Sequence, residues 1–310
     1  MDHQEAVTMF FAEGPDGVTD PRAVTRGAPA RVLRDALEPL AMHGVWAKRT
    51  REALHSHGHD FFSGYVACRA GVLGEGAPGL LVASTFAVFE PSFLADAWDR
   101  GRALLGQEAT QELRDTETTA NLRETLDGHA DESEVAETAD ILERAVDAVP
   151  VTGRPLFAAL RARPRLSDPF GRLWRAADLV REHRGDGHNA ASIAAGLDPI
   201  EMGILAELWV DYSLGEYSGT RAWPQEAADA AARGLVDRGL ITSADSDAGL
   251  TPAGLRFRDE VEARTDASQD ELIAALGDDL GTVVERLARW SARCVEAGAF
   301  PPDVRKRAAG

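Results

Sequence analysis

The sequence predicts a mostly α-helical protein in which an N-terminal helical domain packs on a C-terminal helix-turn-helix domain. Two observations carry this prediction. Apolar residues recur at helical spacing through much of the 310-residue chain. In the C-terminal half, two helical segments joined by a tight turn precede a further helix, which is the order of a helix-turn-helix unit. A chain of this length can form two domains or one large helical body.

Charge and composition narrow the possible partners. The formal net charge is −18, and DNA is itself a dense polyanion, so binding to DNA is not expected. No apolar run approaches the roughly 20 residues that span a bilayer, and the first residues lack a basic region followed by an apolar segment. We therefore expect a cytoplasmic protein without a membrane partner. Cys68 and Cys294, far apart in the chain, are expected to be buried free thiols.

The N-terminal half begins with an irregular lead, residues 1–26, which is interrupted by glycines and prolines. The N-terminal helical domain then spans residues 27–150. Its first helix is expected from Pro29 to about Lys48, with Pro39 as a kink. The apolar runs 61–70 and 80–89 are expected to be buried helices, although the β-branched and aromatic content of 80–89 also permits a strand.

Residues 107–148 are acidic and favour helix, so they predict two surface helices that break at Asp127 and Gly128 and present a solvated face. Before them, His55, His57 and His59 alternate along a short stretch. Alternating histidines on a strand could bind a metal, but Gly58 and the flanking helical patterns favour a solvated turn.

The C-terminal domain is expected over residues 151–300, followed by a tail at 301–310. A helical run covers residues 168–180, and a short helix covers 190–197. Asp198 and Pro199 are suited to the cap and first turn of the next helix. A further helix is expected from about Trp223 to Arg238.

The segment that follows contains LVDRGLI at 235–241, a polar tip at 243–249 and LTPAG at 250–254. With these residues it resembles MarR-type winged-helix proteins. It implies a winged helix-turn-helix domain with a small β-wing, and in such proteins DNA is read by a dimer. Here, however, the helix carries Glu226, Asp229 and Asp237, and the tip carries Asp245 and Asp247 without a Lys or Arg. The phosphate contacts of a DNA reader are largely missing.

Nearly the whole chain is also similar to an actinobacterial family of helix-turn-helix proteins of uncertain function. The similarity rests on LEPLAMHGVWA at 37–47, GRPLFAAL at 153–160, LWRAADLVREHRGDGH at 173–188 and the wing. This resemblance implies a fold more than an activity.

Polar chemistry concentrates at residues 181–188, where Gly185 and Gly187 predict a turn. Three interpretations compete. His183, Asp186 and His188 form an acid/base cluster with catalytic roles. Alternatively, they bind a divalent metal with His43 as a further ligand, although no known metal-binding spacing is matched. In the third interpretation the turn is structural, with Asp186 capping the next helix.

The preferred hypothesis is a small-molecule-binding protein or enzyme of actinobacterial specialised metabolism, with a pocket between the two halves. Arg181 and Arg184 could hold a carboxylate or phosphate of the ligand. The other expected ligand-binding residues are His43, Trp46, Tyr65 and Trp174. The alternative is a ligand-responsive, MarR-like regulator that binds DNA as a homodimer. No cofactor is indicated by the sequence.

Overall fold

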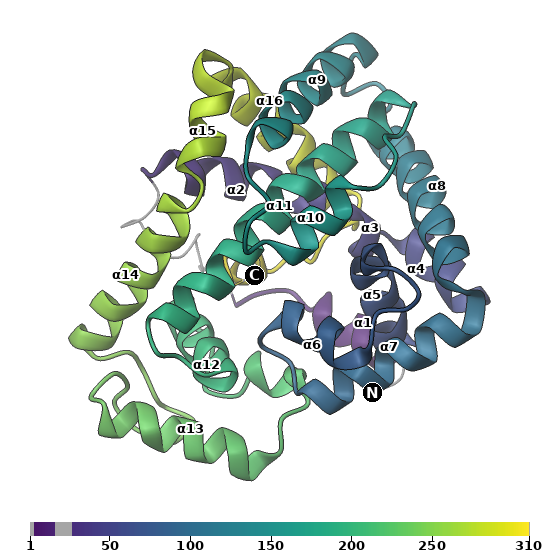
Figure 1. Cartoon of the computed structure of the whole chain (residues 1–310). Helices are drawn as coiled ribbons and strands as arrows, with labels where there is room; N and C mark the ends of the chain where they lie inside the picture. Colours follow the sequence, from purple (N-terminus) through teal and green to yellow (C-terminus); the bar gives the residue numbers. More distant parts are fainter. Residues whose placement is uncertain (1–2, 16–26, 310) are drawn as a thin grey trace.

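The computed structural model describes residues 3–15 and 27–309, and within these ranges every regular element is a helix (Figure 1). The α-helices are α1 (His3–Phe10), α2 (Pro29–Ala41), α3 (His43–Trp46), α4 (Lys48–Ser56), α5 (Phe61–Ala70), α6 (Gly79–Phe86), α7 (Pro91–Leu105), α8 (Gln107–Leu126), α9 (Glu132–Ala148), α10 (Pro155–Arg161), α11 (Pro169–Ala194), α12 (Pro199–Trp209), α13 (Gln225–Asp237), α14 (Pro252–Ala267), α15 (Asp270–Leu276), α16 (Leu280–Glu296) and α17 (Val304–Ala309). Short 3-10 turns include η2 (Gly71–Leu73), η3 (Ser218–Arg221) and η4 (Gly277–Asp279). None of these helices is both long and apolar enough to cross a membrane.

The 26-residue helix α11 is the central element (Figure 1). It starts sharply because the Asp168 carboxylate accepts the backbone amide of Phe170 at 2.9 Å and Pro169 occupies the first turn. Its sides pack against α2, α8, α9, α10 and α14. One uninterrupted helix is therefore in contact with helices from both halves of the chain.

The three largest of five apolar clusters among the described residues stabilise the arrangement. The largest joins α2, α8, α9, α11 and α16 and includes Trp174 and Trp290. A second, rich in aromatic residues, joins α1, α5, α6 and α7 around Phe61 and Trp98. The third joins α12, α13 and α14 around Leu235. The helix-turn-helix segment thus has a small core of its own.

Several helices confirm the predictions from sequence. Both apolar runs are helical as α5 and α6, and the acidic stretch is divided into α8 and α9 at the expected break. Asp198 caps α12, with Pro199 in the first turn and Glu201 completing a capping box. The two cysteines are buried and free. The expected helix to Lys48 is divided instead, because α2 ends at Ala41 and α3 begins at His43.

The prediction of a small β-wing is wrong. Residues 241 and 250 form one isolated antiparallel bridge, and no strand occurs in the described ranges. The chain turns at Gly239, whose φ is 69°, and again at the tip, where the amide of Ala248 donates to the Asp245 carbonyl. Too few residues remain between the two turns to extend a β-ladder. A winged helix-turn-helix domain is accordingly replaced by an all-helical unit with a short looped hairpin.

Two further expectations differ from the structure. Residues 3–10 form α1 where an irregular lead is expected, and residues 304–309 form α17 in the expected tail. Residues 16–26 of that lead lie outside the described ranges. His55 lies in α4, and His55 and His57 are exposed, but His59 is buried, so the stretch is only partly a solvated turn.

Candidate functional site

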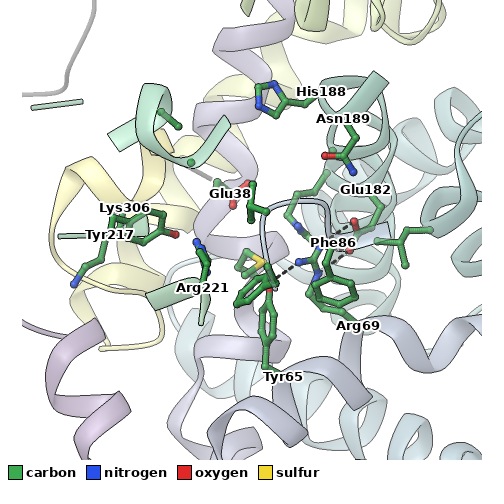
Figure 2. A pocket seen from close by; sticks show the side chains of 18 of the residues that line it. Glu38, Tyr65, Arg69, Phe86, Glu182, His188, Asn189, Tyr217, Arg221 and Lys306 are labelled. Atoms are coloured by element: carbon green, nitrogen blue, oxygen red, sulfur yellow. Dashed lines mark hydrogen bonds and ion pairs between the residues drawn. The ribbon is translucent and has the colours of Figure 1, made fainter. Parts of the chain in front are cut away.

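A cavity of about 200 Å³ lies between the N-terminal helices, α11 and α12 (Figure 2). Its walls come from α2, α5 and α6 on one side, α11 along another, and α12 with the η3 segment on a third. Trp46, Phe61, Phe86 and Phe89 supply much of its apolar surface. Aromatic walls with a few polar groups are the usual composition of a small-molecule site.

The polar wall of the cavity is one face of α11. Glu182, Gly185, Asp186 and Asn189 all line it, because residues three, four and seven positions apart share a helix face. The prediction of a turn at residues 181–188 is wrong, since α11 continues without interruption from Pro169 to Ala194. The two glycines serve close packing and cavity space, and they do not bend the chain.

Gly187 and Gly185 differ in the space around them, so we expect opposite effects from alanine. A Cβ at Gly187 would lie 2.3 Å from Ser268 Oγ and 2.9 Å from Arg154 Nη1, whereas at Gly185 the nearest atom, Glu182 Oε2, is 3.8 Å away. Gly187→Ala is expected to destabilise by about 1–2 kcal/mol, the cost of overpacking. Gly185→Ala should stabilise by up to about 1 kcal/mol through helix propensity. Urea denaturation of both variants checks this pair, and equal effects would contradict the assigned packing.

Asp186 is the group of this face with the most altered acidity. It is 5% exposed, and its carboxylate accepts the backbone amide of Phe157 at 3.0 Å. Burial raises its pKa to about 7, helped by the neighbouring Glu182, while the Phe157 hydrogen bond and Arg154 act in the opposite direction. Asp186 therefore holds or releases a proton near neutral pH.

The three predicted histidine participants behave differently. His188 lines the cavity and its Nδ1 lies 3.0 Å from Thr265 Oγ1. His183 is buried away from the cavity lining, with Nδ1 2.7 Å from Gln269 Oε1 and its ring against Phe157. His43 is fully buried, with Nε2 2.8 Å from Asn121 Oδ1. Burial lowers the pKa to about 3 for His188 and to about 4 for His183 and His43, so all three are neutral at pH 7.

The predicted acid/base cluster is consequently only partly assembled. Asp186 and His188 share the cavity, whereas His183 and His43 face other surroundings. No hydrogen bond joins Asp186 to either histidine of α11 in the described part of the chain. The described residues also contain no group of three His, Cys, Asp or Glu side chains that could hold a metal ion. Geometry gives the metal-binding interpretation no support.

Arg181 and Arg184 line the cavity but already have carboxylate partners. Arg181 donates to Asp178 at 3.2 Å and also to Glu182. Arg184 pairs with Glu262 and, at 3.1 Å, with Asp266. Their charges are compensated inside the protein, which weakens the expectation that they hold an anionic ligand.

The aromatic residues predicted to bind a ligand do not all line the cavity. Trp46 and Tyr65 line the cavity. Trp46 packs against Phe10, Phe61 and Phe300, with ring centroids 5.4, 5.8 and 6.4 Å away. Trp174 is instead fully buried in the main core, where its indole donates to the Ala41 carbonyl at 3.1 Å.

Sequence reasoning missed several polar residues of the cavity, among them Arg69, Glu182 and Arg221. Arg69 on α5 donates to Glu182 through two bonds of 3.1 and 3.0 Å (Figure 2). This pair joins residues 113 positions apart, and no local pattern marks it. Arg221, in η3, also lines the cavity. Glu182 could have been found from its helical spacing to Asp178 and Asp186 if a continuous helix had been expected.

Comparison with known protein families matches residues 30–301 to a family described as "Helix-turn-helix family". No curated protein matches the chain, and no solved structure does. The match covers the N-terminal helices, α11 and the C-terminal helices together. The described cavity residues that lie outside it are on α1 and α17.

Proposed function

We propose, from the premise that this chain belongs to the helix-turn-helix family, that it binds a small organic molecule in the cavity beside α11. The observation that carries the proposal is the cavity itself, about 200 Å³ of space walled by aromatic side chains and edged by polar groups. Ligand sites combine these features, with apolar area supplying affinity and a few polar groups fixing orientation.

An enzymatic role is the finer form of this proposal. Asp186 is the candidate acid/base group because its pKa lies close to neutral pH and it faces the cavity. His188 could contribute as a neutral hydrogen-bonding partner. His183 is better explained as a structural residue, since its ring is packed between Phe157 and Gln269.

Filling the cavity tests the proposal. A leucine at Gly185 would place its side chain in the open space beside α11. A small molecule that binds wild type, present at a concentration of about 100 times its Kd, should raise the Tm by about 5 °C. A thermal-shift screen of small aromatic and heteroaromatic compounds is expected to give such hits for wild type and none for Gly185→Leu.

Gly281→Leu is the matched control, because Gly281 is exposed and no atom lies within 4 Å of a Cβ there. Its hits should equal those of wild type. Compounds that stabilise Gly185→Leu as strongly as wild type bind elsewhere, and a screen without wild-type hits would count against the cavity as a ligand site.

A DNA-binding regulator is the second candidate, favoured by the family and by the adjacent helices α12 and α13. The surface of α13 opposes it. Glu226, Asp229 and Asp237 are exposed there, as are Arg233 and, at the end of the helix, Arg238. Arg238 is held by Glu201 at 2.9 Å. This surface would repel phosphates.

We expect fluorescence anisotropy with a labelled random-sequence duplex to show no binding tighter than about 10 μM, even at about 50 mM salt. A regulator would bind more tightly at that salt concentration and lose affinity steeply as salt increases. Binding that is tight at low salt and weakens steeply with salt would therefore favour the regulator over a helix-turn-helix protein that does not bind DNA.

A further inference from the structure

Arg221 differs from the other arginines of the cavity. Arg69, Arg181 and Arg184 each have a carboxylate partner. No carboxylate oxygen of the described residues lies within the 4.0 Å ion-pair distance of the Arg221 guanidinium. Figure 2 shows Arg221 among the cavity side chains. Glu38, an acid that also lines the cavity, lies 3.9 Å from Arg34.

The position of Arg221 is fixed by aromatic rings and by the backbone. Its guanidinium lies 4.5 Å from the ring centroid of Phe89 and 4.5 Å from that of Tyr217. Its carbonyl accepts the Glu90 amide at 2.9 Å, and the indole of Trp223 donates to the Val88 carbonyl at 2.8 Å. The segment is thus attached to the α6–α7 corner, and the cation is oriented without an internal acid.

A guanidinium in a partly desolvated, aromatic cavity is stabilised when an anion binds to it. Guanidinium groups bind carboxylates through two parallel hydrogen bonds, and these bonds strengthen where water is excluded. The aromatic part of the lining, including Trp46, Phe61 and Phe86, suits a flat apolar body. A volume of about 200 Å³ limits that body to a small one.

We infer that the cavity accepts an aromatic carboxylate, with the carboxylate bound by Arg221 and the ring system between the aromatic walls. This inference rests on the proposed function, because it names the class of ligand for the same cavity. It also assigns the polar end of the ligand to η3 and not to the α11 face that the sequence favours.

Calorimetric titration of the full chain near neutral pH tests the inference with matched probes. These are benzoate, naphthoate and biphenylcarboxylate, each paired with its primary amide, which keeps the shape and removes the charge. At least one carboxylate should bind wild type about 10- to 100-fold more tightly than its amide, the range expected for hydrogen bonds to charged groups. Arg221→Met should abolish this preference, and Arg221→Lys should keep part of it.

Arg233→Met is the charge-matched control, because Arg233 is exposed on α13 and does not line the cavity. It should bind the probes as wild type does. If amides bind wild type as tightly as carboxylates, the cavity is a ligand site but the anion inference is overturned. If no probe of either kind binds, while the compound screen gives cavity-dependent hits, the inference alone fails. The absence of hits in both experiments overturns the proposed function as well.

Discussion

Glu262→Gln is expected to destabilise the protein by roughly 3–5 kcal/mol, the usual cost of removing one partner from a buried ion pair. Glu262 is 1% exposed and binds Arg31 Nη1 at 2.8 Å, Arg258 Nη1 at 2.7 Å and the Arg184 guanidinium. Glutamine keeps the size of the side chain but leaves three buried cations with one fewer negative charge. Urea denaturation at pH 7 measures the loss.

Glu260→Gln on the same helix is the control. Glu260 is exposed, so its change should stay within about 0.5 kcal/mol. A loss of similar size for both variants would show that the network around Glu262 contributes little.

The same residue predicts a pH dependence. Burial alone would raise the pKa of Glu262, but Arg184, Arg258 and Arg31 outweigh burial and hold the pKa well below 4.5. A depressed pKa stabilises the folded state above the pKa of the unfolded chain, and this contribution is lost as the pH falls through the folded pKa. Wild type should therefore lose more stability than Glu262→Gln on acidification below about pH 4.5. Parallel acid titrations of the two proteins would contradict this assignment.

Asp186→Asn is expected to stabilise the protein by about 2–4 kcal/mol at pH 8 and to have little effect at pH 4. The asparagine carbonyl can still accept the Phe157 amide, and the variant carries no charge to bury. A pKa of about 7 in the folded state, against 3.8 for the ordinary group, means that folding favours the protonated acid. Stability linked to Asp186 is thus complete below about pH 4 and declines as the pH rises to 7.

Urea denaturation of wild type and Asp186→Asn at several pH values checks this result. The unfolding free energies of the two proteins should diverge between about pH 4 and pH 7, because wild type loses stability as the pH rises. At Glu262, wild type instead loses stability as the pH falls. Asp229→Asn on the exposed face of α13 is the control and should leave the pH dependence of wild type unchanged. A destabilised Asp186→Asn at pH 8 would mean that the charged carboxylate is the favoured form.

The helices that could be predicted from sequence are those with strong local signals. Asp198 and Pro199 mark the start of α12, and the break between α8 and α9 follows from a glycine after a long helical pattern. The β-wing could not be predicted correctly, because a resemblance at residues 235–254 indicates a turn without giving the length of the strands beside it. Pairing depends on tertiary context as well as on local propensity.

Part of the cavity lining could be predicted, because polar side chains concentrate at residues 181–188. Asp186, His188, Arg181 and Arg184 do line the cavity, along with Trp46 and Tyr65. Gly185 and Gly187 led to the prediction of a turn. Glycine also occurs within helices where neighbouring side chains pack closely, as at Gly187. Residues such as Arg221 depend on contacts between distant segments, which a single sequence does not show.

The unbroken course of α11 limits how ligand binding could alter the shape of the molecule. At about 1.5 Å per residue its 26 residues form a rod of roughly 39 Å that connects the N-terminal helices to α14. Because a helix of this length is stiff, any displacement of α11 on ligand binding would involve both of its ends together. The joint where it meets α12 is Gly196, with a φ of 75° and open space around it. Glycine is suited to this left-handed turn, and no neighbouring side chain of the described residues packs against the backbone of the connection at this residue.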